Sequence, residues 1–279
     1  MQSQNDQYIS KKVAVPLEFK EVFSHFYVAH NKGDESIQKT LFPSYKPILV
    51  FNFGKASFIS PSQQKTITIG KCLVLGPVKK AFEYTLGDHT ELFVVNFKDD
   101  GFHRFFSQAM VDNHGGVHPD ELVEENCFSN LWKQLISLES AEERAAYLIE
   151  FCRPYLEKED KTIRKITDLN NRTAVDPIKT VADKTGQSER NVQLKHKKYL
   201  GYNAKAYARY QRFLKTIAFI QQRIESTQEK IDWFDVIEQN GYYDQPHLIR
   251  DFKYYLAITP SQYLALHRDI CIARPSDKG

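Results

Sequence analysis

The sequence has no apolar run long enough to cross a bilayer. The longest, around residues 47–53, is far shorter than the roughly 20 residues that a membrane helix needs. The first ten residues, MQSQNDQYIS, lack the charged and apolar regions of a signal peptide. We therefore expect a cytoplasmic protein. With 279 residues, the chain fits two domains that can each bury a core.

Cysteine is scarce and scattered. The four cysteines, Cys72, Cys127, Cys152 and Cys271, form no Cys-x-x-Cys pair. This spacing argues against a zinc knuckle and against a redox dithiol. We expect reduced thiols that are mostly buried.

The motifs of common enzymes are also missing. There is no glycine-rich phosphate loop and no Gly-x-Ser-x-Gly elbow. Cupin metal sites need two histidines one residue apart, a later Glu and a distant third His, but no His-x-His pair occurs. Only His89 and Glu91 hint at such a set, while His103, His114 and His118 lie in a separate stretch. We expect no metal, no cofactor and no catalytic residue, and therefore a protein that is not an enzyme.

The net charge of +3 conceals an asymmetry between the two halves. Residues 155–279 carry 22 Lys+Arg against 16 Asp+Glu, whereas the residues before them carry 16 against 19. Within residues 188–215 the one acid is Glu189, and the eight basic residues are Arg190, Lys195, Lys197, Lys198, Lys205, Arg209, Arg212 and Lys215. A solvated helix face usually mixes both signs. This excess is what a surface facing phosphates requires.

The first half has the pattern of short strands. Between residues 25 and 97, Gly, Pro or polar pairs separate seven segments rich in β-forming residues: HFYVAH, KPILVFNFG, ASFIS, KTITIG, KCLVLGPV, AFEYTL and TELFVVNF. Seven closely spaced strands predict a small antiparallel barrel or sandwich. Six aromatic residues are candidates for lining a ligand cavity, although core packing is the commoner role: Phe51, Phe53, Phe82, Tyr84, Phe93 and Phe97.

Helical patterns follow in GFHRFF, FSNLWKQLISL and SAEERAAYLIEFCRPYL, where Ser140 and Glu143 have the spacing of a capping box. Their apolar stripes either pack on the strands or pair two chains, and we expect a homodimer through this half: Leu131, Leu135, Leu138, Ala145, Leu148, Ile149 and Cys152. The charged run LEKEDKTIRK, residues 156–165, predicts a hinge region between a domain of residues 1–155 and one of residues 156–279.

Two segments of the second half share one layout. In residues 177–200 and in residues 232–257, a short helix is followed by a turn at Gly186 or Gly241, an N-cap at Ser188 or Asp244, and a second helix. Their inward positions are Ile178, Val181, Ala182, Val192, His196 and Tyr199 in the first, and Trp233, Val236, Ile237, Leu248, Phe252 and Tyr255 in the second. This is the helix-turn-helix pattern, whose second helix enters the major groove.

A long helix is expected between the two units, with apolar residues at Tyr207, Tyr210, Leu214, Ile217 and Ile224. This helix would fix the distance between the two second helices. Specific recognition needs them about one turn of DNA apart, roughly 34 Å.

The stretch GYYDQPHLIRDFKYYLAITPSQY resembles the C-terminal signature of the AraC/XylS family of bacterial transcription regulators. The matching positions are Gly241, Tyr242, Asp244, Gln245, His247, Leu248, Arg250, Phe252, Lys253, Thr259, Pro260 and Tyr263. The first unit fits more loosely, through Ala182, Gly186, Ser188, Arg190, Val192, Gly201 and Tyr207. The likeness covers roughly residues 163–268. It implies a sequence-specific DNA-binding protein that acts on RNA polymerase at promoters, usually as an activator.

The resemblance also implies roles for single residues. The groove-facing positions correspond to Arg190, Asn191, Gln193 and Leu194 in the first unit and to Gln245, Pro246, His247 and Arg250 in the second. Four lysines are better placed for phosphates, which set affinity and register but carry no sequence information: Lys197, Lys198, Lys205 and Lys253.

Some positions depart from the family pattern. Leu194 stands where the family usually has Arg, so it is suited to a thymine methyl group and not to guanine. His196 replaces a core Phe, and we expect it to pack against the first helix of its unit with one ring nitrogen hydrogen-bonded. Ile237 replaces a small Ala, and Asn203-Ala204 stands for the common Ser-Pro.

The first half, through LFPSYKPILVFNFG and VLGPVKKAFEYTLGDHTELFVVNFKDDGFHRFF, resembles the N-terminal sensory domains of some of these regulators. Such domains have a cupin-like barrel followed by helices, and they bind small effectors or mediate dimerisation. The expected fold is therefore α+β, with an antiparallel β-domain and an all-α DNA-binding domain. The alternative is a cupin-type metal-dependent enzyme domain tethered by a helical module that binds DNA or protein.

Overall fold

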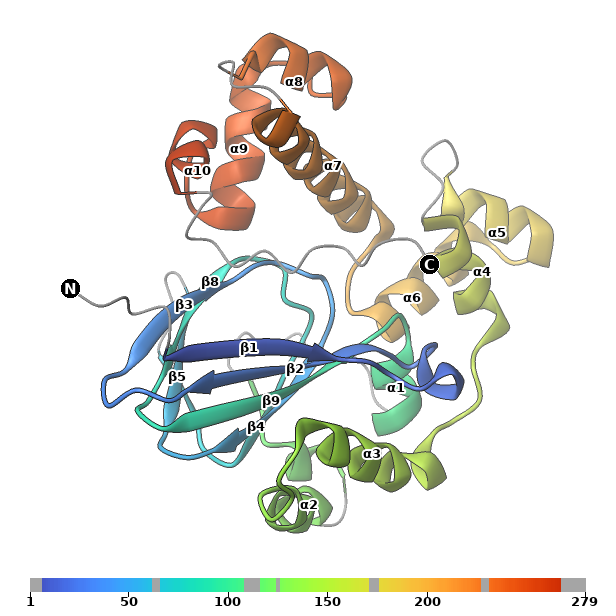
Figure 1. The fold of residues 1–279 in the computed structure, drawn as a ribbon. Coiled ribbons are helices and arrows are strands. Elements are labelled where there is room, and N and C mark those ends of the chain that lie inside the picture. The colour runs from blue at the N-terminus through green and yellow to red at the C-terminus, as the bar shows by residue number, and fades with distance from the viewer. Residues whose placement is uncertain are drawn as a thin grey trace.

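The computed structural model describes residues 7–61, 66–107, 116–123, 126–170, 176–226 and 231–266. The fold is α+β with two domains, as expected, and the strands come before nearly all of the helices (Figure 1). Helices α2 (Cys127–Leu135) and α3 (Ala141–Cys152) lie at one end of the molecule. The last helices of the chain lie at the opposite end, beyond the sheets.

Two antiparallel sheets make up the first half. One has the order β1 (Tyr8–Val13), β2 (Phe23–Asn31), β9 (Thr90–Phe97), β4 (Ile48–Phe53), β7 (Cys72–Leu75). The other has the order β3 (Ile37–Leu41), β8 (Phe82–Leu86), β5 (Ser57–Pro61), β6 (Ile67–Ile69). All seven expected strands are present. The sequence pattern missed β1 and β3, which are sheet edges with mostly polar or charged side chains that stay at least partly exposed.

The first sheet is covered on both faces. One face packs on α1 (Gly101–Phe106), α2 and α3 through residues such as Phe26 and Phe51. The other face meets the second sheet through Val50, Leu92 and their neighbours. Every residue of β4 is therefore buried, which explains why its sequence is a continuous apolar run and not an alternating one.

The six candidate cavity residues are divided between these two cores. Phe51, Phe53, Phe93 and Phe97 pack in the core between the first sheet and the helices, and only Phe82 and Tyr84 lie between the sheets. Core packing is therefore confirmed for the five that are buried, whereas Phe82 is only partly buried.

The stripes of α2 and α3 are buried against the first sheet. The expected capping box is present, since Ser140 accepts from the Glu143 amide and the Glu143 side chain from the Ser140 amide. Because the stripes are internal, they are not available to pair two chains. The homodimer remains a prediction without this support.

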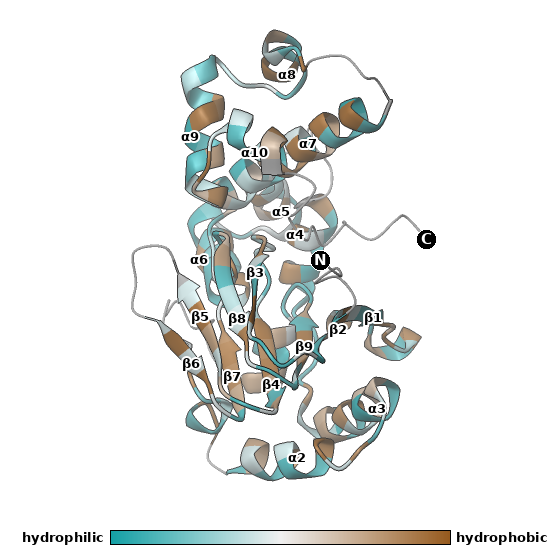
Figure 2. Ribbon diagram, turned by 60° about the vertical axis from the view of Figure 1, so that its left-hand side comes forward, coloured by the Kyte–Doolittle hydropathy of each residue, from teal (hydrophilic) through white to brown (hydrophobic). Residues whose placement is uncertain are grey.

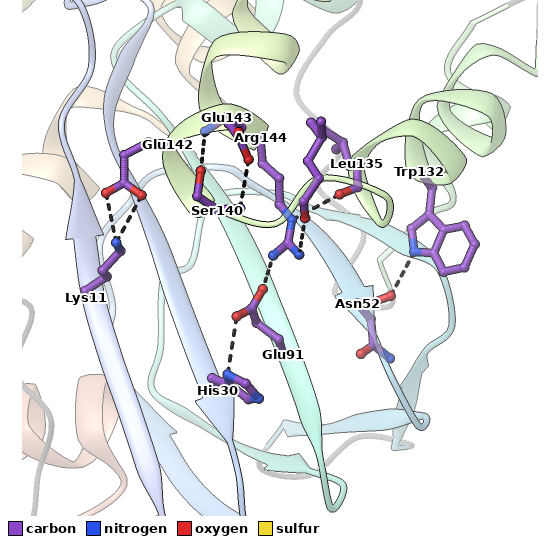
Figure 3. Close-up of polar contacts among 11 residues, drawn as sticks. Lys11, His30, Asn52, Glu91, Trp132, Leu135, Ser140, Glu142, Glu143 and Arg144 are labelled. Atoms are coloured by element: carbon purple, nitrogen blue, oxygen red, sulfur yellow. Dashed lines mark hydrogen bonds and ion pairs between the residues drawn. The ribbon is translucent and has the colours of Figure 1, made fainter.

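Arg144 fastens α2 and α3 to the sheet (Figure 3). Its guanidinium pairs with Glu91 of β9 and lies 4.4 Å from the ring centre of Phe53. Its Nε and Nη2 also donate to the carbonyl oxygens of Leu135 and Leu138, at 3.0 and 2.9 Å. The buried guanidinium thus bonds both the backbone carbonyl groups near the end of α2 and a carboxylate on a strand. These bonds fix the helices on the sheet.

The second half consists of α4 (Lys161–Asn170), α5 (Pro177–Thr185), α6 (Glu189–Leu200), α7 (Ala204–Ser226), α8 (Trp233–Gln239), α9 (Gln245–Leu256) and α10 (Pro260–Leu266). These helices share one core around Ile166, Val181, Phe213 and Phe252. Brown and teal alternate along α7 and α9 in Figure 2, as expected for helices with one apolar face.

A loop of the first half completes this core. Tyr45, between β3 and β4, is only 3% exposed and stacks on Tyr210 of α7 at 4.3 Å. The Tyr210 hydroxyl donates to the carbonyl oxygen of Pro43 at 2.6 Å. Tyr45 adopts a left-handed conformation with φ 54, which is unusual for a residue with a side chain. The two halves are therefore joined by packed aromatic rings and not only by the chain between them.

Candidate nucleic-acid interface

The turns of both units form as the sequence predicts. Gly186 and Gly241 have φ of 65 and 68, values that favour glycine. Ser188 caps α6 by accepting from the Asn191 amide at 3.3 Å, and Asp244 caps α9 by accepting from the His247 amide at 2.7 Å. The starts of α6 and α9 are therefore fixed by local hydrogen bonds.

The inner faces of α6 and α9 are buried as expected. Val192 and His196 on α6, and Leu248, Phe252 and Tyr255 on α9, have no exposed surface. Tyr199 differs, because it is only partly buried and stacks on His103 of α1 with ring centres 4.0 Å apart. Trp233 and Ile237 of α8 are partly buried at the edge of the core.

The opposite faces carry the residues predicted to contact DNA. All twelve except His247 are exposed: Arg190, Asn191, Gln193, Leu194, Gln245, Pro246, Arg250, Lys197, Lys198, Lys205 and Lys253. Leu194 is 59% exposed, an unusual position for a leucine unless a partner covers it. Within the described ranges, the four lysines form no ion pair with an acidic side chain.

Fewer basic side chains are available to face DNA than the composition suggested. Of the eight basic residues in 188–215, Lys195 pairs with Asp160 at 2.9 Å, and Arg209 and Arg212 both pair with Asp251, at 2.7 and 3.0 Å. These three cations are partly neutralised within the protein.

Asp251 joins α9 to α7. Its side chain has no exposed surface and receives both arginines from α7. Arg209 also lies 4.5 Å from the ring centre of Tyr254. The helix-turn-helix pattern does not mark this acid, although it lies three residues after Leu248 and four before Tyr255, on the buried stripe. A carboxylate on an apolar stripe is a recognisable signal for a buried ion pair.

The His247 side chain is more buried than the sequence suggested. Its Nε2 lies 2.9 Å from Nη2 of Arg212, and its ring meets Tyr242 edge-on at 5.2 Å. It is partly buried, unlike the other predicted reading residues. Its position on the flank of α9 leaves only part of the ring at the surface.

His196 packs as expected. Its Nδ1 donates to the carbonyl oxygen of Tyr202 at 2.7 Å, while its buried Nε2 has no partner in the described ranges. Burial lowers the pKa of His196, so the ring is neutral at physiological pH. This histidine belongs to the core and not to the exposed face of α6.

The histidines considered for a metal site are dispersed. His89 contacts Asp34 at 2.8 Å, whereas Glu91 is engaged by Arg144 and His30. His114 lies outside the described residues. Within the described ranges, no three His, Cys, Asp or Glu residues are grouped so as to hold a metal ion.

One cysteine–histidine pair was not anticipated. Cys72 Sγ lies 3.0 Å from Nε2 of His118, 46 residues further along the chain. Burial raises the pKa of the Cys72 thiol to about 12, so it stays protonated and is a poor nucleophile. Asp120, beside His118, is occupied in capping α2 through the Phe128 and Ser129 amides. The pair is therefore structural.

Three of the four cysteines lie within the described residues. Cys72 and Cys152 are buried as expected, Cys127 is partly buried, and no disulfide joins these three residues, whereas Cys271 lies outside the described ranges. No described helix combines the length and the hydropathy needed to span a bilayer.

Comparison with known proteins gives weak likenesses only. No family model and no curated protein matches the chain. A structure of ToxT from Vibrio cholerae is 8% identical, with a TM-score of 0.41, over 86% of this chain and 97% of that one. A ToxT structure with bound unsaturated fatty acid is 12% identical, with a TM-score of 0.38, over 95% and 97%. A cupin protein from Desulfovibrio desulfuricans is 10% identical, with a TM-score of 0.27, over 34% and 85%. These values are too low to transfer a function to this chain.

Proposed function

We propose that this protein is a sequence-specific DNA-binding transcription regulator of the AraC/XylS type. The observation that carries the proposal is the pair of helix-turn-helix units, whose second helices bury one face and expose the other. Helices of this form enter the major groove in many DNA-binding proteins. The sequence signature in residues 241–263 supports the same assignment.

In this proposal, residues 156–279 bind DNA. Helix α6 reads bases through Arg190, Asn191, Gln193 and Leu194, and α9 through Gln245, Pro246, His247 and Arg250. The exposed Lys197, Lys198, Lys205 and Lys253 contact phosphates. Arg250 is the principal reader, because an exposed guanidinium can bind guanine O6 and N7 together.

Residues 1–155 are proposed to be the sensory and dimerisation domain. We also propose that the protein acts in the cytoplasm as a homodimer. It would bind a small-molecule effector and activate transcription through RNA polymerase. The contact of Tyr45 with Tyr210 supports a regulatory role, because a change in the first half would reach the DNA-binding half through this packing.

The test is selection of genomic fragments by the purified protein, followed by binding assays at several salt concentrations. We expect tight binding to a subset of fragments that weakens as salt is added. Arg250→Ala should weaken binding to this subset about 10- to 100-fold, while weak nonspecific binding persists.

Arg153→Ala is the matched control. It removes the same charge from an exposed site in the first half, where Arg153 pairs with Glu18 and Glu150. Its affinity should remain close to that of the wild type. The proposal fails if the wild type enriches no fragment, and the role of Arg250 fails if Arg250→Ala binds like the control.

A further inference from the structure

Arg212 of α7 contacts two residues of α9 and one residue of the turn that precedes it. Its Nη2 lies 3.0 Å from Asp251 Oδ2 and 2.9 Å from His247 Nε2. Its guanidinium carbon lies 4.7 Å from the ring centre of Tyr242. The ion pair and the aromatic ring hold the guanidinium in place, so the Nη2 hydrogen bond to His247 is a fixed feature of the site.

This arrangement determines where the proton of His247 lies. A guanidinium has only donors and keeps its charge in proteins. The ring nitrogen that faces it must therefore accept, which leaves Nε2 without a proton and places the single proton of the neutral ring on Nδ1. Nδ1 has no hydrogen-bond partner among the described residues. It is also absent from the buried atoms that lack a partner, so it reaches solvent. His247 thus offers solvent one N–H donor and no acceptor.

We propose that Arg212 is a specificity-determining positioning residue, which makes His247 a dedicated hydrogen-bond donor on the DNA-facing side of α9. This inference rests on the proposed DNA-binding function. In the major groove, such a donor favours guanine O6 or N7, adenine N7 and thymine O4. It disfavours the amino group of cytosine, which is itself a donor. Without Arg212, either ring nitrogen can carry the proton, and the preference at that base position declines.

Arg209 supplies the matched control. It is also on α7 and also pairs with Asp251, at 2.7 Å, but within the described ranges it forms no hydrogen bond with the His247 ring. Arg209→Met and Arg212→Met each remove one cation from the same carboxylate, so both weaken the attachment of α9 to α7. Only Arg212→Met frees the tautomer of His247.

The first measurement needs no DNA. Long-range proton–nitrogen NMR of the full chain with ¹⁵N-labelled histidine identifies the His247 signals by their loss in His247→Ala. At a pH where the ring is neutral, we expect Nδ1 protonated and Nε2 unprotonated in the wild type and in Arg209→Met. Arg212→Met should shift the ring toward a mixture of both tautomers. A wild-type ring protonated on Nε2 would overturn the inference.

The second measurement selects bound sequences from a random duplex library. We expect one base position whose preference falls about two- to tenfold in both Arg212→Met and His247→Ala and persists in Arg209→Met. Equal relaxation in the two arginine variants would reduce Arg212 to a structural ion pair. An unchanged motif in His247→Ala would mean that His247 binds a phosphate or nothing. If the wild type enriches no motif, the proposed function fails instead, whereas the NMR result still decides the tautomer.

Discussion

The two second helices differ in how far their exposed faces are ordered before any partner binds. On α9, Arg250 Nε donates to the carbonyl oxygen of Pro246 at 3.2 Å, and His247 is held by Arg212. On α6, the exposed guanidinium of Arg190 has no comparable polar contact within the described ranges. Side chains that are ordered in advance lose less entropy on binding. Helix α9 is therefore the more pre-organised of the two.

The two helices also differ in their attachment to the first half. Helix α6 meets α1 through the stack of Tyr199 on His103. The end of α9 is held by the loop before β8, where the Ala81 amide donates to the carbonyl oxygen of Tyr255 at 2.7 Å. A rearrangement of either part of the first half would therefore move one helix relative to the other.

The largest expected effect is at the aromatic junction. Tyr45→Ala removes a buried ring that contacts Tyr202, Tyr210 and Tyr255, and should lower the free energy of unfolding by about 3–5 kcal/mol. Ala keeps the left-handed backbone strain, so the loss reports packing alone. Urea unfolding followed by circular dichroism measures it. Tyr45→Phe, which keeps the ring, should stay near the wild type, and a loss below about 1 kcal/mol in Tyr45→Ala would contradict this role.

The next effect concerns the ion pairs that α9 has and α6 lacks. Asp251→Ala leaves Arg209 and Arg212 without their buried carboxylate and should cost about 2–4 kcal/mol, somewhat less than for fully buried cations, because both arginines reach solvent. Asp183→Ala, on the exposed face of α5, should change stability by less than about 0.5 kcal/mol. Chemical denaturation of both variants checks the difference. Similar losses would show that the Asp251 contacts do not stabilise the fold.

Measurements of DNA affinity compare the contributions of the two helices more directly. We expect Arg250→Ala to reduce affinity for a selected fragment by about 1–3 kcal/mol, and Arg190→Ala to reduce it by less, because Arg190 must be ordered on binding. Titration of both variants against the same fragment gives the comparison. A larger loss in Arg190→Ala would reverse the ranking of the two readers.

His196 predicts a pH dependence for the α6 unit. Burial lowers its pKa below the ordinary value of 6.5, so the unfolded chain binds a proton more readily than the native protein. Its contribution to stability is therefore present above pH 6.5 and is lost as pH falls, by at most about 1.4 kcal/mol per pH unit. His196→Phe removes this loss. Unfolding at pH 8 and pH 5 should show the wild type weakening relative to the variant, and parallel curves would refute the assignment.

The smallest effects are expected from the lysines. Lys197→Ala on α6 and Lys253→Ala on α9 should each weaken binding similarly across DNA sequences. Each should also reduce the slope of log affinity against log salt by about 0.9 if one phosphate contact is lost. A change in the selected motif would indicate that the lysine reads bases.

The sequence predicted the features that depend on neighbouring residues. The caps at Ser140, Ser188 and Asp244, the turns at Gly186 and Gly241 and the inner stripes of α6 and α9 are all periodic or local signals. The packing of Tyr45 on Tyr210 and the contact of Cys72 with His118 join residues far apart in the chain. No periodicity records such contacts, because they depend on how the elements come together. The edge strands β1 and β3 were missed because their polar side chains hide the strand pattern.

In the proposed complex, α6 and α9 enter the major groove of one DNA duplex together. Major-groove protection of a selected fragment measures whether both helices are bound. We predict two protected segments about 10 base pairs apart, one lost in Arg190→Ala and the other in Arg250→Ala. A single protected segment that responds to neither substitution would show that the two helices do not bind one duplex in this way.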